Sequence, residues 1–137
     1  MTNSQLPRGC IDMDYSQLTD FEINKRIAKA TGTQIEETYQ FVNGGEDIAD
    51  HMSGIVLMRK ITSNRKHWKL YDPCNDPADA WPIITANKIS IYAMSEADAR
   101  GKWGVEAFYH NEAYHFNDNP LRAAMIVFLM MQDAKNA

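Results

Sequence analysis

Apolar positions at helical spacing predict a first helix near the start of the chain. From residue 21 to residue 30 the apolar side chains fall on one face of a helix, and charged side chains fall largely on the other. Thr19 and Glu22 have the spacing of a capping box, in which each side chain binds the backbone of the other end of the first turn. Gly32 is typical of a left-handed helix stop. We therefore expect a helix between Thr19 and Gly32.

A second, shorter helix is predicted over residues 77–87. Asn75 or Asp76 can cap it, and Pro77 suits the first helical position, where no backbone donor is needed. Asp79 then falls in the first turn, where the positive end of the helix dipole favours an anion.

The last predicted helix is apolar on nearly all sides. Asn119 or Asp118 caps it, Pro120 takes its first position, and apolar residues fill most positions from 121 to 131. Its longest apolar run has nine residues, whereas a membrane span needs about 20. Such a helix either lies centrally on a sheet or gives its second face to another subunit. We expect the subunit interface, and hence a homo-oligomer.

Alternating apolar and polar positions predict short strands between these helices. The strands lie at residues 33–42, 55–61, 67–71, 88–94, 103–110 and 112–116, with Ser63-Asn64 as a turn. The order of elements predicts an α+β fold: one antiparallel sheet of three to five strands covered by about three helices, with an α/β/α sandwich as one arrangement. We expect one globular domain over residues 13–137 and an N-terminal extension over residues 1–12.

Composition and charge narrow the classes of partner. The 137 residues include 14 Lys and Arg and 18 Asp and Glu, so the net charge is −4, which disfavours direct binding to nucleic acid. A local basic patch stays open as an alternative, with five cations within eleven residues: Arg59, Lys60, Arg65, Lys66 and Lys69. The two cysteines, Cys10 and Cys74, lie far apart and suit a reducing cytosol better than a disulfide scaffold.

Catalytic signatures are missing from the sequence. It has no nucleophile elbow, HExxH motif, P-loop or GxGxxG motif, so we expect neither a cofactor nor a catalytic centre. His110 and His115 flank Glu112, which is metal-ligand chemistry, but strand alternation favours ordinary hydrogen-bonded histidines and no metal. An enzyme using Asp79, His110 or Glu112 as acid or base on a small phosphorylated substrate is the weakest alternative.

Arg122 is the most informative charged residue. It lies in the first turn of the last helix, where a cation meets the positive end of the dipole. An internal salt bridge explains this placement, with Asp79 as the natural partner. A bound phosphate or carboxylate, which the free amides of the same turn can also bind, is the alternative.

Two tryptophans extend the ligand hypothesis. Trp81 and Trp103 can stack on a nucleobase, although large aromatic side chains more often belong to the core. We take five residues as candidate ligand-binding residues: Arg122, Trp81, Trp103, Asn119 and Asp79.

Four blocks of the sequence carry a resemblance to a known family. The blocks are MDYSQLTDFEIN (13–24), DPCNDPADAWPII (72–84), NKISI (87–91) and NPLRAAMIVFLMMQ (119–132). They resemble the NinX proteins of lambdoid bacteriophages and prophages. The resemblance implies a small phage protein of the bacterial host cytoplasm, encoded among accessory genes near recombination and late-regulation functions. It brings no catalytic residues.

Together these features favour a non-enzymatic phage accessory protein without a membrane anchor. The leading hypothesis is counter-defence: the protein binds or sequesters a host molecule, either a nucleotide-like defence signal or a host protein. The alternative is an auxiliary factor of phage DNA recombination or replication, acting through a protein partner or the local basic patch.

Overall fold

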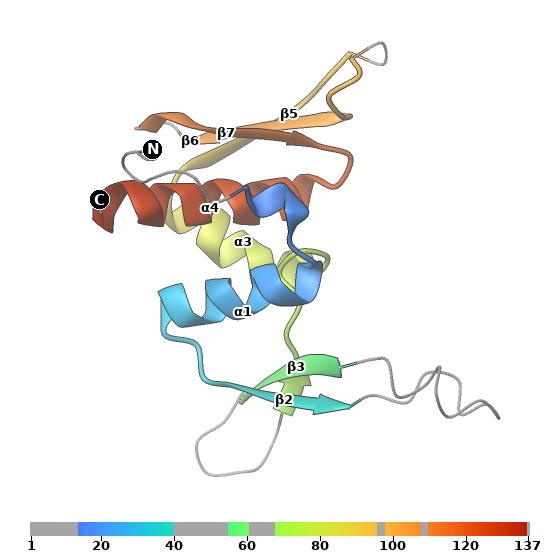
Figure 1. Cartoon of the computed structure of the whole chain (residues 1–137), viewed down its shortest axis with the longest axis vertical. Coiled ribbons are helices and arrows are strands. Elements are labelled where there is room, and N and C mark those ends of the chain that lie inside the picture. Colours follow the sequence, from blue (N-terminus) through green and yellow to red (C-terminus); the bar gives the residue numbers. More distant parts are fainter. Residues whose placement is uncertain (1–13, 40–54, 61–67, 96–97, 108–109, 137) are drawn as a thin grey trace, which may run out of the picture.

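The computed structural model describes residues 14–39, 55–60, 68–95, 98–107 and 110–136. Its elements follow one another in an α+β order, as the sequence predicts (Figure 1). The elements are η2 (Tyr15–Gln17), α1 (Asp20–Thr31), β2 (Ile35–Tyr39), β3 (Ile55–Lys60), β4 (Trp68–Leu70), α3 (Pro77–Ala86), β5 (Ile89–Ala93), β6 (Trp103–Ala107), β7 (His110–Asn117) and α4 (Pro120–Asn136).

The helix ends lie where local side-chain chemistry places them. Thr19 and Glu22 form the complete capping box of α1, and Gly32 ends it in the left-handed region at φ 72°. Asp76 caps α3 by accepting the amide of Ala78 at 3.0 Å, with Pro77 in the first turn. The side chain of Asn119 caps α4, accepting the amides of Leu121 and Arg122 at 2.9 and 3.2 Å.

The strands form two antiparallel sheets of three strands each, in the orders β2-β3-β4 and β5-β6-β7. Both the α+β class and the antiparallel pairing are confirmed. The expected single sheet and the α/β/α sandwich are wrong, because the two sheets are separate and the helices lie between them (Figure 1). Strand alternation finds each strand, but it assigns His110 to the strand of residues 103–110, whereas His110 begins β7 and pairs with Ala107. It also does not show which strands share a sheet.

The layers can be followed in Figure 1 from one sheet to the other. The sheet β5-β6-β7 lies on α4, α1 and α3 pack on α4 away from that sheet, and β3 contacts α1. The turn predicted at Ser63-Asn64 and the extension predicted at residues 1–12 lie outside the described residues.

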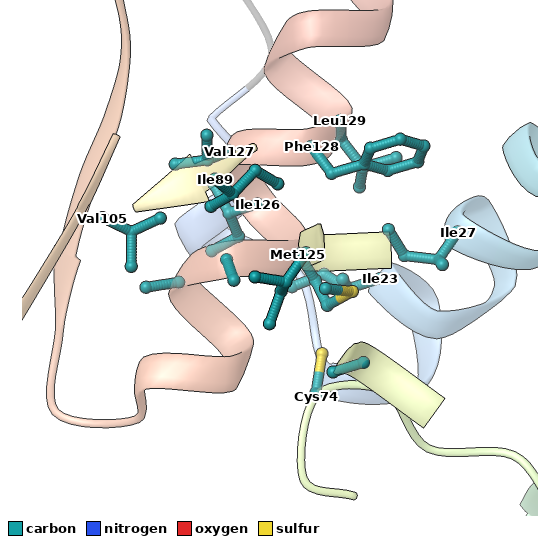
Figure 2. Packing of buried hydrophobic residues seen from close by; sticks show 14 of the residues in the cluster. Ile23, Ile27, Cys74, Ile89, Val105, Met125, Ile126, Val127, Phe128 and Leu129 are labelled. Carbon is teal, nitrogen blue, oxygen red and sulfur yellow. The ribbon is translucent and has the colours of Figure 1, made fainter. Parts of the chain in front are cut away.

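Helix α4 is the centre of the hydrophobic core. Its residues from Ala123 to Leu129 are each at most 5% exposed. Figure 2 shows the side chains from Met125 to Leu129 between Val105 of the sheet and Ile23 and Ile27 of α1. Burial of each large aliphatic side chain contributes about 1.5 to 3 kcal/mol. The alternative that places this helix centrally on a sheet is therefore correct, and α4 needs no second subunit to cover it. The homo-oligomer stays a prediction, but the apolar character of α4 no longer supports it.

Candidate functional site

Arg122 binds the start of α1. Its guanidinium donates through Nη1 to Asp20 Oδ1 at 2.5 Å, and through Nη2 to the carbonyl oxygens of Ser16 and Leu18 at 3.2 and 2.8 Å. The internal salt bridge expected for Arg122 is present, but its partner is Asp20 and not Asp79. Asp20 accepts this bond from the first turn of α1, where the helix dipole also favours its negative charge.

Asn119 joins the start of α4 to the turn before α3. Besides capping α4, it donates through Nδ2 to Cys74 O and to Asn75 Oδ1, both at 2.9 Å. Asn75 in turn donates to Asp20 Oδ2 at 3.0 Å and to the carboxylate of Asp72. We call Asp20, Asp72, Asn75, Asn119 and Arg122 the polar junction, because these residues connect the starts of α1 and α4 with the turn before α3.

Asp79 is held in a different way. Its side chain is 1% exposed, and Oδ2 accepts the amide of Asp72 at 2.9 Å. Its Oδ1 has no hydrogen-bond partner among the described residues, although Arg59 Nε and Lys69 Nζ each lie 3.7 Å away. Two cations of the sheet β2-β3-β4 therefore face a buried carboxylate of α3, which explains why Asp79 does not pair with Arg122.

The two tryptophans lie on different elements. Trp81 is on α3 and is 60% exposed, whereas Trp103 begins β6, on the same side of the strand as the buried Val105. No aromatic pair among the described residues joins their rings. The ligand-binding role of the five candidate residues stays a prediction, but the structure does not bring them together as one pocket wall.

The histidines give no sign of a metal centre in the described part of the chain. His115 is half-buried, and burial together with the nearby positive charge of Arg122 lowers its pKa. The side chains of His110 and Glu112 lie outside the described residues. No group of three or more potential metal ligands occurs among the side chains that the structure describes.

The sheet β5-β6-β7 has one face on α4 and one face that no described element covers (Figure 1). Strand register places Tyr92, Gly104 and Phe116 side by side across the three strands. In the next row Ser90 and Glu106 are followed by Tyr114. Val105 on the intervening row is fully buried against α4, so the row of Tyr92 and the row of Tyr114 belong to the outer face.

The ring of Tyr92 occupies the space above Gly104 on this outer face, because Gly104 has no side chain. A Cβ built on Gly104 would come within 2.6 Å of Tyr92 Cζ and 2.9 Å of the Tyr92 hydroxyl oxygen. The ring of Tyr92 thus crosses from β5 onto β6 and covers Gly104, which is buried. Tyr92 itself stays 38% exposed, so the ring is supported from below and open to solvent above.

Arg100 and Phe116 extend the aromatic surface onto β7. The guanidinium carbon of Arg100 lies 4.1 Å from the centroid of the Phe116 ring, a cation–π contact. Tyr114, 53% exposed, meets Phe116 edge to face at 6.0 Å between centroids and 62° between ring planes. We call Tyr92, Arg100, Tyr114 and Phe116 the aromatic face.

The charge of Arg100 is balanced where it lies. Arg100 donates through Nε and Nη2 to the two carboxylate oxygens of Asp98 at 3.0 and 2.7 Å. These bonds lower the pKa of Asp98 to about 2 and raise the pKa of Arg100. The nearby Tyr92 and Tyr114 also raise the pKa of Arg100. The bidentate pair fixes the plane of the guanidinium over Phe116.

A glycine also sets the position of the Arg100 loop. Gly101 has φ 143°, and a Cβ there would lie 2.8 to 2.9 Å from the backbone atoms of Asn117. The loop can therefore rest directly on the end of β7, which brings Arg100 above Phe116.

Sequence reasoning did not select the aromatic face. The alternation within residues 88–94 and 103–110 assigns Tyr92 and Gly104 to the side opposite Ile91 and Val105. That signal becomes informative only when the register places Tyr92 beside Gly104 and Phe116. The irregularity between Glu106 and Ala107 hides this register from the sequence.

Comparison with known protein families gives a match. The family model described as Bacteriophage P22, NinX matches residues 14–132, which include both sheets, α1, α3 and α4 as far as Gln132. The chain belongs to the NinX family. This confirms the resemblance of the four sequence blocks, and it makes the chain a phage accessory protein.

Neither the curated proteins nor the solved structures include a match to this NinX chain. Within the described residues, none of its helices has the length and apolar character needed to cross a membrane.

Proposed function

We propose that this NinX protein acts by binding, and that it holds a host protein during infection through the aromatic face. The observation that carries the proposal is the ring of Tyr92, which lies on Gly104 beside Phe116 and Arg100. Tyrosine and arginine are enriched among the few residues that dominate the binding energy of protein interfaces, and phenylalanine is enriched in interfaces as a whole. In the phage context, capture of a host protein in the host cytoplasm is a counter-defence function.

The polar junction favours a protein partner over a nucleotide-like signal. A nucleotide site built on Arg122 needs its guanidinium for phosphate, but that group donates to Asp20, Ser16 and Leu18 within the chain. The side chain of Arg122 is only 15% exposed. Release of these contacts would leave Asp20 and two carbonyl oxygens without their donor, at a cost of about 1 to 3 kcal/mol.

An auxiliary role in phage DNA recombination or replication is the second candidate, but no contact favours it. Of the five cations of the basic patch, Arg59 and Lys69 face the carboxylates of Asp79 and Asp76. Arg65 and Lys66 lie outside the described residues. We therefore place the protein-binding surface on the other sheet.

Quantitative co-purification from phage-infected bacteria tests the proposal. The full chain is used as bait in four forms: unchanged, with Tyr92→Ser and Tyr114→Ser together, with Trp81→Ser, and with Leu70→Ser. Leu70 is the matched control, since it is a 40% exposed apolar residue on the other sheet. Trp81→Ser tests the rival surface on α3.

We expect one host protein to be enriched by the unchanged bait and by Leu70→Ser and Trp81→Ser, and to be lost from the double tyrosine variant. The purified pair should then bind in isothermal titration calorimetry, with affinity reduced at least about tenfold by the tyrosine changes. Loss with Trp81→Ser alone would move the site to α3. Equal enrichment by all four baits would contradict the proposal.

A further inference from the structure

We propose that the aromatic face binds a short proline-rich segment of its partner in an extended conformation. This inference rests on the proposed function, because it names the chemistry of the segment that the same surface takes. It depends on three properties of the face: its size, its charge, and the way in which its rings are held.

The size of the face fits a short peptide. Strands β5 and β6 have five residues each, so at about 3.3 Å per residue and about 4.8 Å between strands the face measures about 16 Å by 14 Å. That is on the order of 200 Å², against about 800 Å² per partner in a stable dimer. A polyproline II segment of about five residues, at about 3.1 Å each, spans the same length. The aromatic face is therefore too small to form a stable dimer interface with a second copy of the chain.

The charge of the face excludes nucleic acid as the favoured occupant. Aromatic rings beside an arginine can also stack on nucleobases, but a protein that binds single-stranded nucleic acid needs uncompensated cations for the phosphates. The guanidinium of Arg100 is already paired in a bidentate manner with Asp98, and Glu106 is exposed between Ser90 and Tyr114. Arg100 therefore offers no free positive charge. Lys102, exposed directly before β6, adds one cation at the edge of the face, but the whole chain carries −4.

The rings are arranged as proline recognition requires. Proline-rich segments have no internal hydrogen bonds, so their carbonyl oxygens are free to accept from tyrosine hydroxyls while their rings pack on aromatic faces. The ring of Tyr92 covers Gly104, and Tyr114 stands at 62° to Phe116, so the surface presents one ring over the bare backbone of β6 and two further rings at an angle to each other. Arg100 holds Phe116 from the adjoining loop. Since the polyproline helix is already ordered before binding, little conformational entropy is lost.

Titration followed by amide NMR tests the inference with the full chain. The probes are decaproline, a Gly-Ser peptide of the same length, and an oligothymidylate of the same length. We expect decaproline alone to give saturable shifts that are largest at residues of β5, β6 and β7, with a dissociation constant on the order of 1 mM or tighter. The double variant Tyr92→Ser with Tyr114→Ser should weaken this binding at least about tenfold. The matched control Leu70→Ser should leave it unchanged.

Each other outcome separates this inference from the proposed function. If decaproline gives no saturable shift on this sheet while a host protein is still captured through Tyr92 and Tyr114, the proline specificity is wrong and the proposed function stands. Saturable shifts on the same residues with oligothymidylate would overturn the inference in favour of nucleic acid. If the Gly-Ser peptide bound as tightly as decaproline, the inference would be wrong, because the face would then bind any peptide backbone. The amide spectrum itself reports whether the double variant is folded, and Tyr92→Phe with Tyr114→Phe replaces it where it is not.

Discussion

Arg122 and Asp20 form an ion pair across 102 positions of the chain, with Nη1 and Oδ1 2.5 Å apart. The pair joins the first turn of α4 to the first turn of α1. Arg122 also donates to the carbonyl oxygens of Ser16 and Leu18, which precede α1. One side chain thus fixes the N-terminal segment on the central helix of the core.

We expect Arg122→Ala to lower the free energy of unfolding by about 2 kcal/mol, because it leaves two carbonyl oxygens and Asp20 Oδ1 without their donor. Urea unfolding followed by circular dichroism measures the change. Lys25→Ala is the matched control: Lys25 pairs with Glu37 at 2.7 Å, but both side chains are nearly half exposed, so the loss should stay below about 1 kcal/mol. Equal losses in the two variants would show that the polar junction does not stabilise the fold.

We expect Asp79→Ala and Asp79→Asn to differ. Alanine leaves the amide of Asp72 without its acceptor and removes the carboxylate that faces Arg59 and Lys69. Its cost should be about 2 to 3 kcal/mol. Asparagine keeps an acceptor for that amide and removes a buried charge, so its cost should stay within about 1 kcal/mol. If urea unfolding gives the same loss for both, the negative charge is the essential feature of Asp79.

The caps illustrate what the sequence alone can predict. Thr19, Asp76 and Asn119 act on amides two or three residues away, so local spacing identifies Thr19 and narrows each of the other caps to two adjacent residues. The partner of Arg122 lies on another helix and depends on how α1 and α4 pack, which is why Asp79 was the wrong choice. The aromatic face depends in the same way on strand register, since Tyr92 and Phe116 meet only through β6.

The lowered pKa of His115 should make stability depend on pH. Burial, and then the positive charge of Arg122, disfavour the protonated imidazole in the folded chain, while Asp14 opposes this in part. As the pH falls, the imidazole is therefore protonated in the unfolded chain, at its ordinary pKa of 6.5, before it is protonated in the folded chain. The contribution of His115 to the free energy of unfolding is complete above pH 6.5 and decreases as the pH falls below that value. We expect His115→Gln to lose less stability than the unchanged chain between neutral pH and about pH 5. Parallel pH dependences in urea unfolding would contradict this role for His115.

Gly104→Ala should separate binding from folding. The added Cβ meets the ring of Tyr92, which is the movable part of a side chain and can lift away from the sheet. We expect the free energy of unfolding to change by less than about 1 kcal/mol, while affinity for the partner falls at least about tenfold because the Tyr92 ring leaves its position over Gly104. Calorimetric titration and urea unfolding of the same preparation check both. Full affinity after this change would mean that the position of the Tyr92 ring over Gly104 is not needed.

The central claim is that the aromatic face is covered by a protein in the infected cell. Hydroxyl-radical footprinting measures this directly, because tyrosine and tryptophan side chains are labelled in proportion to their exposure. Tyr92, Tyr114 and Trp81 are read in one experiment, on the purified chain and on the chain in an extract of phage-infected bacteria. We expect the extract to protect Tyr92 and Tyr114 and to leave Trp81 labelled as before. Unchanged labelling of both tyrosines, or protection of Trp81 alone, would contradict the account.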